Sequence, residues 1–432
     1  MPYKIIFWPC IKKLGNLSFS IFLLLLISAI SILGTIVEQN QSIEYYQANY
    51  PLNTTKLLKI DWKIIQFFKL NELYSNWGFL CLVTLFALSL IVCTLSTQLP
   101  SLKNARRWKL KKQITSHDIS SKDKIPNIVC PASIIYFLNQ TDYYTFHQSF
   151  YTYSYKGLLG RLAPILVHIS LINILIGSLI SLLTSVSFQE MIPEGELFHL
   201  KNIIKSGQFS SIPDNFTGKI NDFKIEYHSN GSIKQFYSNI AIINKQFKIV
   251  TNKTISVNKP LYFQGFTLYQ TDWEVNGLKL KIGTNQIIYL PLHKISNNNQ
   301  SYWLSSFDET INKKIILLVS DLYSPVLCYD VDGKLLQSIK LKEKTTINDI
   351  PLEIIELIKS TGIQIKKDLG IPIIYSNFFL LMLSSVVSYS SYSQLWLISY
   401  ANEIKIFGTT NRAKLKFEHD ILALKKMIIN LY

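Results

Sequence analysis

The chain has 432 residues, of which 48% are apolar, with a net charge of +16 and a mean hydropathy of +0.19. This composition is too apolar for an ordinary soluble protein and is typical of a few membrane spans joined to a sizeable polar domain. The five cysteines form no Cys-x-x-Cys pair, which excludes a thioredoxin-type redox motif and a Cys-x-x-Cys-His haem-attachment site. Cys81 and Cys93 lie in an apolar segment, and we expect both to be buried there as small hydrophobic side chains.

Four stretches are long and apolar enough to cross the hydrocarbon core, which needs roughly 20 residues. They are 17–37, 77–96, 162–183 and 371–392. The first is not a signal peptide, because its apolar core is too long and no small-residue cleavage pattern follows it. Residues 1–96 therefore hold two spans and a short loop. The predicted fold class is an α-helical polytopic membrane protein with four transmembrane helices and a large, mainly-β extramembrane domain.

The charges between the spans predict an orientation. The loop 97–161 holds ten Lys and Arg against three acids, whereas the loop 38–76 holds four of each. Because Lys and Arg near span ends stay on the cytoplasm-like side, we expect the N-terminus, the 97–161 loop and the tail 393–432 there, and 184–370 opposite. The basic cluster KNARRWKLKK, 103–112, is expected to contact anionic membrane lipid, and no nucleic acid is expected as a partner.

Residues 184–370 are predicted to be mainly β. Alternating apolar and polar positions flank an Asn-Gly pair at 230–231, and an Asp-Gly pair at 332–333 lies in a similar stretch. Both pairs are strong hairpin signals. Short strands at close spacing suggest a sandwich or a small barrel.

No catalytic set emerges in this β domain. Its three histidines, His199, His228 and His293, are scattered and belong to no HExxH motif. No GxSxG motif or glycine-rich phosphate loop is present either. His228, beside a turn, is expected to be a solvated surface residue. Cys328 is expected to be a buried strand thiol, with a mixed disulfide to another protein as the alternative. Nothing here is typical of an enzyme.

His168 lies inside the third predicted span, about seven residues from its cytoplasm-like end and some 10 Å along the helix. Ionisable residues in a membrane usually face a bundle interior or a wet cavity and are functional candidates. The alternative is a neutral imidazole that bonds a Ser or a backbone carbonyl of a neighbouring helix. Arg161 lies two turns away on nearly the same face, so the pair suits haem, with propionates at Arg161 and iron at His168. Asn173 projects from a different face.

Several stretches carry a family pattern, in the family's order and over almost the whole chain. They are LGNLSFSIFLLLLISAISILGTIVEQNQ, YKGLLGRLAPILVHISLINILIGSLI, YFQGFTLYQTDW, TGIQIKKDLGIPIIYSNFFLLMLSS and FGTTNRAKLKFEHDI. Together they resemble the CcsB/ResB family, the membrane component of System II cytochrome c assembly. The resemblance implies a complex with a CcsA/ResC-type membrane protein that carries haem across the membrane and presents it, reduced, to apocytochromes c.

The resemblance also implies a shared haem b site. The family's intramembrane histidine maps onto His168, which would pair with a histidine of the partner as an axial ligand of a transiently bound haem. The family's tryptophan-rich haem-binding motif belongs to the partner and has no equivalent here. This chain is therefore not expected to be a complete enzyme by itself.

Further positions match the family pattern, and both a structural and a functional reading stay open for them. They are Gly34, Thr35, Glu38 and Gln39 after the first span, Tyr269, Gln270 and Trp273 in the β domain, Lys367 and Asp368 before the fourth span, and Asn411 and Arg412 in the tail.

The chain begins without an Arg/Ser-rich transit segment, and its composition indicates AT-rich coding. With the family's distribution, this predicts an organelle-encoded protein of the plastid thylakoid membrane, with both termini stromal and the large domain lumenal. A bacterial inner membrane is the alternative. In a plastid the targets would be cytochrome f and c-type carriers.

Two other functions stay open at the level of sequence. One is a membrane scaffold that docks apocytochrome or partner and never binds haem. The other is a stand-alone haem transporter subunit, which is disfavoured because four spans with one buried ionisable residue and no inverted repeat make a poor alternating-access pathway.

Overall fold

The computed structural model divides the chain into two compact units, Met1–Leu179 with Ile371–Tyr432, and Ile180–Gly370. It describes residues 9 and 11–430 apart from the gaps 53–60, 110–118, 121–124, 127–129, 214–215, 230–231, 284–285, 298–299, 311–312, 348–349 and 400–402.

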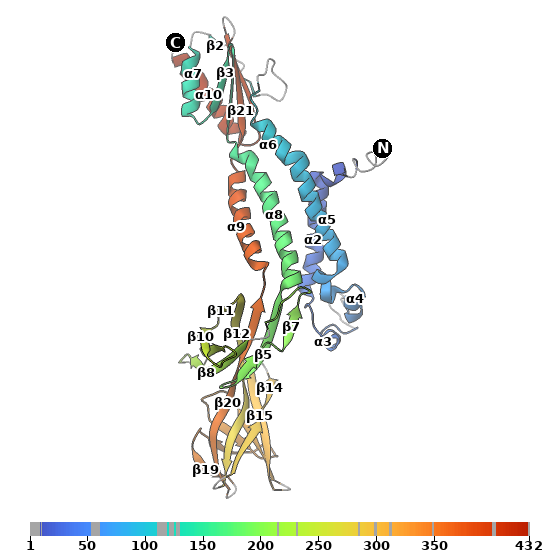
Figure 1. The fold of residues 1–432 in the computed structure, drawn as a ribbon, viewed down its shortest axis with the longest axis vertical. Helices are drawn as coiled ribbons and strands as arrows, with labels where there is room; N and C mark the ends of the chain where they lie inside the picture. The colour runs from blue at the N-terminus through green and yellow to red at the C-terminus, as the bar shows by residue number, and fades with distance from the viewer. Residues whose placement is uncertain are drawn as a thin grey trace. The chain divides into compact units, whose positions relative to one another are not determined.

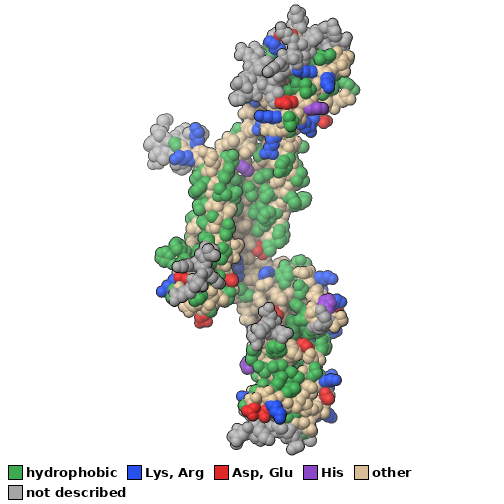
Figure 2. Space-filling view, turned by 180° about the vertical axis from the view of Figure 1, so that it is seen from behind, with side chains coloured by type: hydrophobic (Ala, Val, Ile, Leu, Met, Phe, Trp, Pro, Cys, Tyr) green, Lys and Arg blue, Asp and Glu red, His purple; other side chains and the backbone are tan. Residues whose placement is uncertain are grey.

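Four helices are long and apolar enough to cross a membrane, which confirms the predicted fold class. They are α2 (Leu17–Ile36), the continuous run α5–η2–α6 (Trp77–Ala105), α8 (Leu159–Thr184) and α9 (Ile371–Ser388). Apolar side chains dominate the surface of these helices, as expected where lipid is the solvent (Figure 2). Cys93 is buried as predicted, but Cys81 is exposed on α5, because its side chain lies on the outer surface of the bundle.

The second of these runs is not a regular α-helix. It consists of α5 (Trp77–Cys93), the π-helical turn η2 (Thr94–Gln98) and α6 (Leu99–Ala105). Pro100 has no N–H to donate to the preceding turn, and the wider turn, in which the Leu99 N–H bonds the Thr94 carbonyl, absorbs this irregularity.

The loop and the tail expected on the cytoplasm-like side fold together into one antiparallel sheet of the first unit (Figure 1). Its strands are β1 (Ile119–Ser120), β2 (Ile125–Pro126), β3 (Tyr144–Gln148), β4 (Tyr151–Lys156), β21 (Ser393–Ser399) and β22 (Glu403–Thr410). Helices α7 (Pro131–Gln140) and α10 (Lys414–Asn430) pack on one face through apolar side chains such as Leu138 and Phe417. The long sequence separation of β4 and β21 hid this layer from sequence reasoning.

Three short helices fill the loop between the first two spans. They are α3 (Ile43–Asn49), α4 (Trp62–Phe67) and η1 (Leu70–Ser75). Val37, Tyr46 and Ile65 form a small apolar cluster beneath them.

The second unit is a β domain of three antiparallel sheets, ordered β10-β9-β8-β6, β11-β12-β20-β5-β7 and β14-β15-β16-β17-β18, with β13 and β19 pairing β12 and β20. The strands are β5 (Val186–Pro193), β6 (Leu197–His199), β7 (Ile203–Ser206), β8 (Thr217–Tyr227), β9 (Ile233–Ile243), β10 (Ile249–Ser256), β11 (Leu261–Phe263), β12 (Phe266–Ile282), β13 (Gln286–Pro291), β14 (His293–Asn297), β15 (Gln300–Thr310), β16 (Lys313–Val319), β17 (Val326–Tyr329), β18 (Leu335–Ile339), β19 (Lys344–Ile347) and β20 (Ile350–Lys367). Two apolar clusters fill its interior.

Both predicted hairpins form. Strands β8 and β9 pair across the Asn-Gly pair at 230–231, which itself lies outside the described residues. Gly333 turns β17 into β18 with a φ of +76°, a backbone conformation that glycine adopts without strain. Cys328 in β17 is fully buried, as predicted for a strand thiol, and burial raises its pKa to about 12.

Candidate functional site

His168 is held by a neighbouring helix through one ring nitrogen. Its Nδ1 lies 2.9 Å from Oγ1 of Thr94, and that hydroxyl lies 2.7 Å from the Leu90 carbonyl. The carbonyl only accepts, so it takes the single Thr94 proton, and Oγ1 then accepts from the Nδ1–H of His168. The imidazole is thereby held as the tautomer whose Nε2 carries a lone pair, the form that ligates metals.

Sequence reasoning singled out His168 but missed Thr94. Thr94 is the first residue of the π-helical turn, and such turns are frequent at functional sites. A signal was present, because Pro100 near the end of an apolar span predicts an irregular helix there. The pairing itself needed the tertiary structure.

Arg161, at the start of α8, lies against the end of the same neighbouring run. One guanidinium N–H donates to Oγ of Ser101 at 3.4 Å, and the guanidinium carbon lies 5.0 Å from the ring centroid of Tyr392. Its Nε is buried without a hydrogen-bond partner. Burial raises the pKa of the Tyr392 hydroxyl, which donates to the Ala105 carbonyl, so this ring stays neutral beneath the cation.

A polar pocket of about 370 Å³ opens at Arg161. Lys109 also lines it, and none of the described lining residues is a carboxylate, so both charged side chains described there are cationic. The Arg161 guanidinium beside this space suits a carboxylate or another anion, which Arg binds through its planar donor fork.

The structure brings Arg161 and His168 to one seam between antiparallel helices. Arg161 contacts Ser101 and His168 contacts Thr94, both on the second run. The two residues of each pair of positions are seven apart along their own helix, so the contacts match in register. Asn173 instead donates to Asn377 of α9 at 3.1 Å and is not part of this seam.

The donor set fits haem better than a free metal ion. Among the described residues, no three His, Cys, Asp or Glu side chains are grouped closely enough to hold a metal ion. A single oriented imidazole, with a cationic pocket two helical turns away, matches a ligand that has one metal centre and carboxylate arms. His168 would ligate the iron, and Arg161 would hold a propionate.

Comparison with known proteins identifies the family. The model of the ResB-like family matches residues 17–287 and 283–422. The chain is 49% identical over 432 residues to the cytochrome c biogenesis protein Ccs1 of Gracilaria tenuistipitata var. liui, covering 99% of this chain and 98% of that protein. It is 42% identical to the protein of the same name from Porphyra purpurea, covering 96% and 95%. The chain belongs to the ResB-like family.

This ResB-like chain is thus a membrane protein with a role in cytochrome c biogenesis, and the resemblance seen in its sequence is confirmed. A further relative, 43% identical over 417 residues, is the Ccs1 protein of Phaeodactylum tricornutum, covering 96% of this chain and 99% of that protein. The agreement in length means that both compact units have counterparts in these relatives.

The family-pattern residues after the first span have structural contacts. The amide of Gln39 donates to the carbonyls of Gly34, Val37 and Leu70 at 2.8–3.0 Å and accepts from the N–H of Leu73 at 3.1 Å. Gln39 therefore caps the end of α2 and ties it to η1, as helix ends require. The Thr35 hydroxyl donates to the Ile32 carbonyl, and Tyr50 donates to Glu38 at 2.9 Å.

The pattern residues beside the fourth span fix the ends of α9. The guanidinium of Arg412 donates to the last carbonyl of that helix, Ser388, at 3.0 Å, and the Asn411 side chain accepts from the Tyr392 N–H at 2.8 Å. Asp368 accepts from the Ser181 hydroxyl and from the Gly370 N–H, and Lys367 donates to Ser211. Helix capping and turn formation account for Asp368, Asn411 and Arg412.

The three aromatic and amide positions of β12 differ from one another. Gln270 is buried and donates to Thr361 at 3.1 Å, and the Lys366 ammonium lies 5.9 Å from the ring centroid of Tyr269. Trp273 is only partly buried and lines a pocket of the β domain. The three histidines of this domain are exposed, as predicted for His228.

Proposed function

We propose that this ResB-like protein delivers haem to apocytochromes c as a subunit of a complex with a CcsA/ResC-type membrane protein. The hydrogen bond from His168 to Thr94 carries the proposal, because it fixes the imidazole tautomer that an axial iron ligand needs. With Nδ1 engaged by Thr94, Nε2 is the ring nitrogen that could ligate iron.

When bound, haem supplies an iron centre that accepts imidazole nitrogen. The chain's own residues bind and orient it. Thr94 holds the ring of His168 from the neighbouring helix, while Arg161 offers its positively charged guanidinium to a propionate.

The haem site is proposed to be shared. His168 is the one histidine in the four predicted spans, so this chain supplies at most one axial imidazole in the membrane. The second ligand would come from the partner, which makes the complex and not the isolated chain the haem-ligating unit.

For location, we propose the plastid thylakoid membrane, with stromal termini and a lumenal β domain that faces cytochrome f and c-type carriers. The charge distribution between the spans and the relatives from red algae and other plastid-bearing organisms support this assignment. A bacterial inner membrane with the same orientation is the alternative. Fusing a reporter of compartment to the C-terminus and to a loop of the β domain tests the orientation.

The test is co-expression with the partner and an absorption spectrum of the purified complex. We expect His168→Ala to lose most bound haem and covalent cytochrome formation, and His168→Gly to regain both with added imidazole. Thr94→Val, which keeps the packing volume, should lower haem occupancy less than His168→Ala and blue-shift or broaden the Soret band. The control His199→Ala changes an exposed histidine of the β domain and should leave the spectrum unchanged.

Full haem occupancy and full activity in His168→Ala would overturn the ligand assignment. No haem in any assembled complex would favour the scaffold, and haem bound by this chain without a partner would favour the stand-alone carrier.

A further inference from the structure

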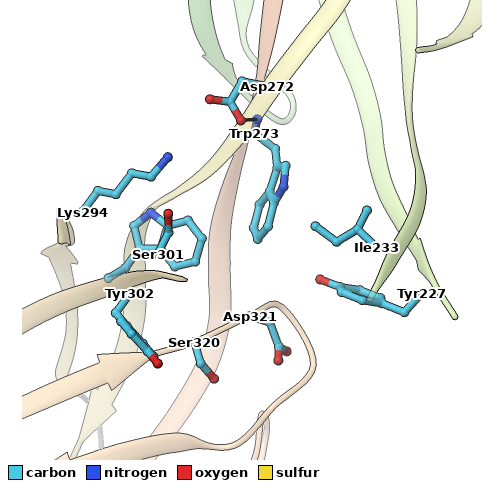
Figure 3. Close-up of a pocket in the computed structure, with 10 residues that line it drawn as sticks. Tyr227, Ile233, Asp272, Trp273, Lys294, Ser301, Tyr302, Ser320 and Asp321 are labelled. Carbon is cyan, nitrogen blue, oxygen red and sulfur yellow. Dashed lines mark hydrogen bonds between the residues drawn. The ribbon is translucent and has the colours of Figure 1, made fainter. Parts of the chain in front are cut away.

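The β domain contains a pocket of about 460 Å³ that its three sheets build together (Figure 3). Its walls come from β8 and β9 of the first sheet, β12 of the second, β14 and β15 of the third, and the loop after β16. Half-open pockets lined by aromatic rings and a few polar groups are typical ligand sites. Neither the haem proposal nor the family comparison uses it.

One wall carries an unsatisfied hydrogen-bond donor. Trp303 is 3% exposed, and its Nε1–H is buried without a partner. Leaving a buried donor unpaired costs about 1–3 kcal/mol, and this N–H has almost no accessible surface, so it marks an imperfectly packed wall of the pocket and does not itself contact the pocket space. The Tyr227 hydroxyl is also buried, and no hydrogen bond to it meets the usual distance and angle limits among the described residues. Burial, together with the negative charge of Asp321, raises its pKa to about 12. The Tyr227 hydroxyl therefore keeps its proton at neutral pH.

Trp273 is aimed into this space by an irregular strand. Pairing of β12 with β20 shifts register between Gln270 and Asp272 and again between Val275 and Gly277. Bulges re-aim the side chains between them. Trp273 lies between the two shifts, projects between Tyr227 and Tyr302 in Figure 3, and has its ring centroid 5.1 Å from that of Trp303.

The charges around these rings favour a cation. Asp272 and Asp321 both line the pocket, against the single ammonium of Lys294. Burial works to raise the pKa of Asp321, but hydrogen bonds from the Ser324 side chain and from the Ser324 and Tyr323 backbone N–H groups hold it below the ordinary value. Carboxylates beside exposed aromatic faces are the usual recognition elements for a Lys or Arg side chain.

An edge strand borders the same pocket. Strand β14 ends its sheet, and Lys294 on it pairs in register with Trp303 of β15. Its outer edge has no strand partner among the described residues, and Ile295 is 48% exposed there. An extended peptide can add to such an edge by main-chain hydrogen bonds while a side chain enters the neighbouring pocket.

We propose that this pocket binds an extended polypeptide segment bearing a lysine or arginine. The main chain of the segment extends the edge at β14, and its cationic side chain lies against Trp273 beside the carboxylates of Asp272 and Asp321. This recognition chemistry stands on the pocket alone. Only the identification of the polypeptide as an apocytochrome c rests on the proposed function.

The test uses the full-length protein and a short fluorescein-labelled Ser-Val-Lys-Val-Thr peptide, with partners in which norleucine or glutamate replaces the lysine. Fluorescence anisotropy gives each Kd. We expect Asp272→Asn to weaken binding of the lysine peptide about tenfold and to leave the Kd of the norleucine peptide unchanged. That difference would show that the Asp272 carboxylate interacts with the positive charge of the lysine.

The control is Asp332→Asn, which removes an exposed carboxylate of the same domain from a hairpin turn outside the pocket and should change neither Kd. Equal affinity for the lysine and glutamate peptides, no measurable binding of the lysine peptide, or an unchanged Kd in Asp272→Asn would overturn the proposal. The haem spectrum of the same samples separates the two proposals, because peptide binding that depends on Asp272 would survive even if no sample held haem.

Discussion

Two buried indoles show how differently the two units use their aromatic residues. In the first unit Trp396 donates its Nε1–H to the Lys109 carbonyl at 2.8 Å and stacks on Phe407 at 5.9 Å. In the β domain Trp303 is buried to a similar degree, yet its N–H has no partner and its ring borders a pocket. A buried donor is normally satisfied, so the first arrangement indicates a closed core, whereas the second leaves one hydrogen bond unmade in the wall of a pocket.

Backbone packing differs in the same direction between the units. Gly157 and Gly333 share a left-handed conformation, with φ of +77° and +76°. A Cβ on Gly157 would lie 2.0 Å from the Ser391 carbonyl oxygen, whereas one on Gly333 would meet nothing within 4 Å. The sheet of the first unit therefore closes tightly over the start of α8, while the hairpin of the β domain turns in open space.

The largest expected effect comes from this glycine pair. Gly333→Ala adds only the strain of a left-handed alanine, about 1–2 kcal/mol, whereas Gly157→Ala adds a backbone clash and should cost several kcal/mol more. Thermal unfolding in detergent, with the yield of folded protein, measures both. If both variants lost the same Tm, the two turns would be equally packed, which would contradict the difference between Gly157 and Gly333.

The tryptophan pair should give an intermediate effect. Trp396→Phe leaves the Lys109 carbonyl without its donor and should lower the unfolding free energy by about 1–3 kcal/mol. Trp303→Phe removes a donor that has no partner, so its stability should stay within about 0.5 kcal/mol of the wild type or rise. The two Tm values test this directly, and a large loss for Trp303→Phe would mean that its N–H is satisfied within the fold.

The smallest effect concerns Cys328, as compared with the exposed Cys130 of the first unit. Since burial raises the pKa of Cys328 to about 12, maleimide at pH 8 should label Cys130 and reach Cys328 only on unfolding. Because the folded state holds this proton more tightly, the thiol's contribution to stability is complete below about pH 9 and is lost as the pH rises toward 12. Cys328→Ala should flatten that alkaline decline, and rapid labelling of the native thiol would contradict its burial.

The candidate haem site was only half readable in the sequence. His168 and Arg161 stood out because charged and ionisable groups are rare in apolar spans, and their spacing placed them on one face. Thr94 and Ser101 did not stand out, since hydroxyl residues are ordinary in such helices and only helix pairing brings them opposite. The pocket of the β domain was less readable still, because its walls come from three sheets.

The sequence by itself determined the four apolar helices, the mainly-β domain, both hairpins and the family, since length, hydropathy, turn residues and local motifs encode them. It did not reveal that the basic loop and the tail form one sheet, because β4 and β21 are more than two hundred residues apart and pairing of that range has no local signature. Only the tertiary structure decided the tautomer of His168 and the unsatisfied N–H of Trp303, because a hydrogen bond depends on which distant atoms packing brings within reach.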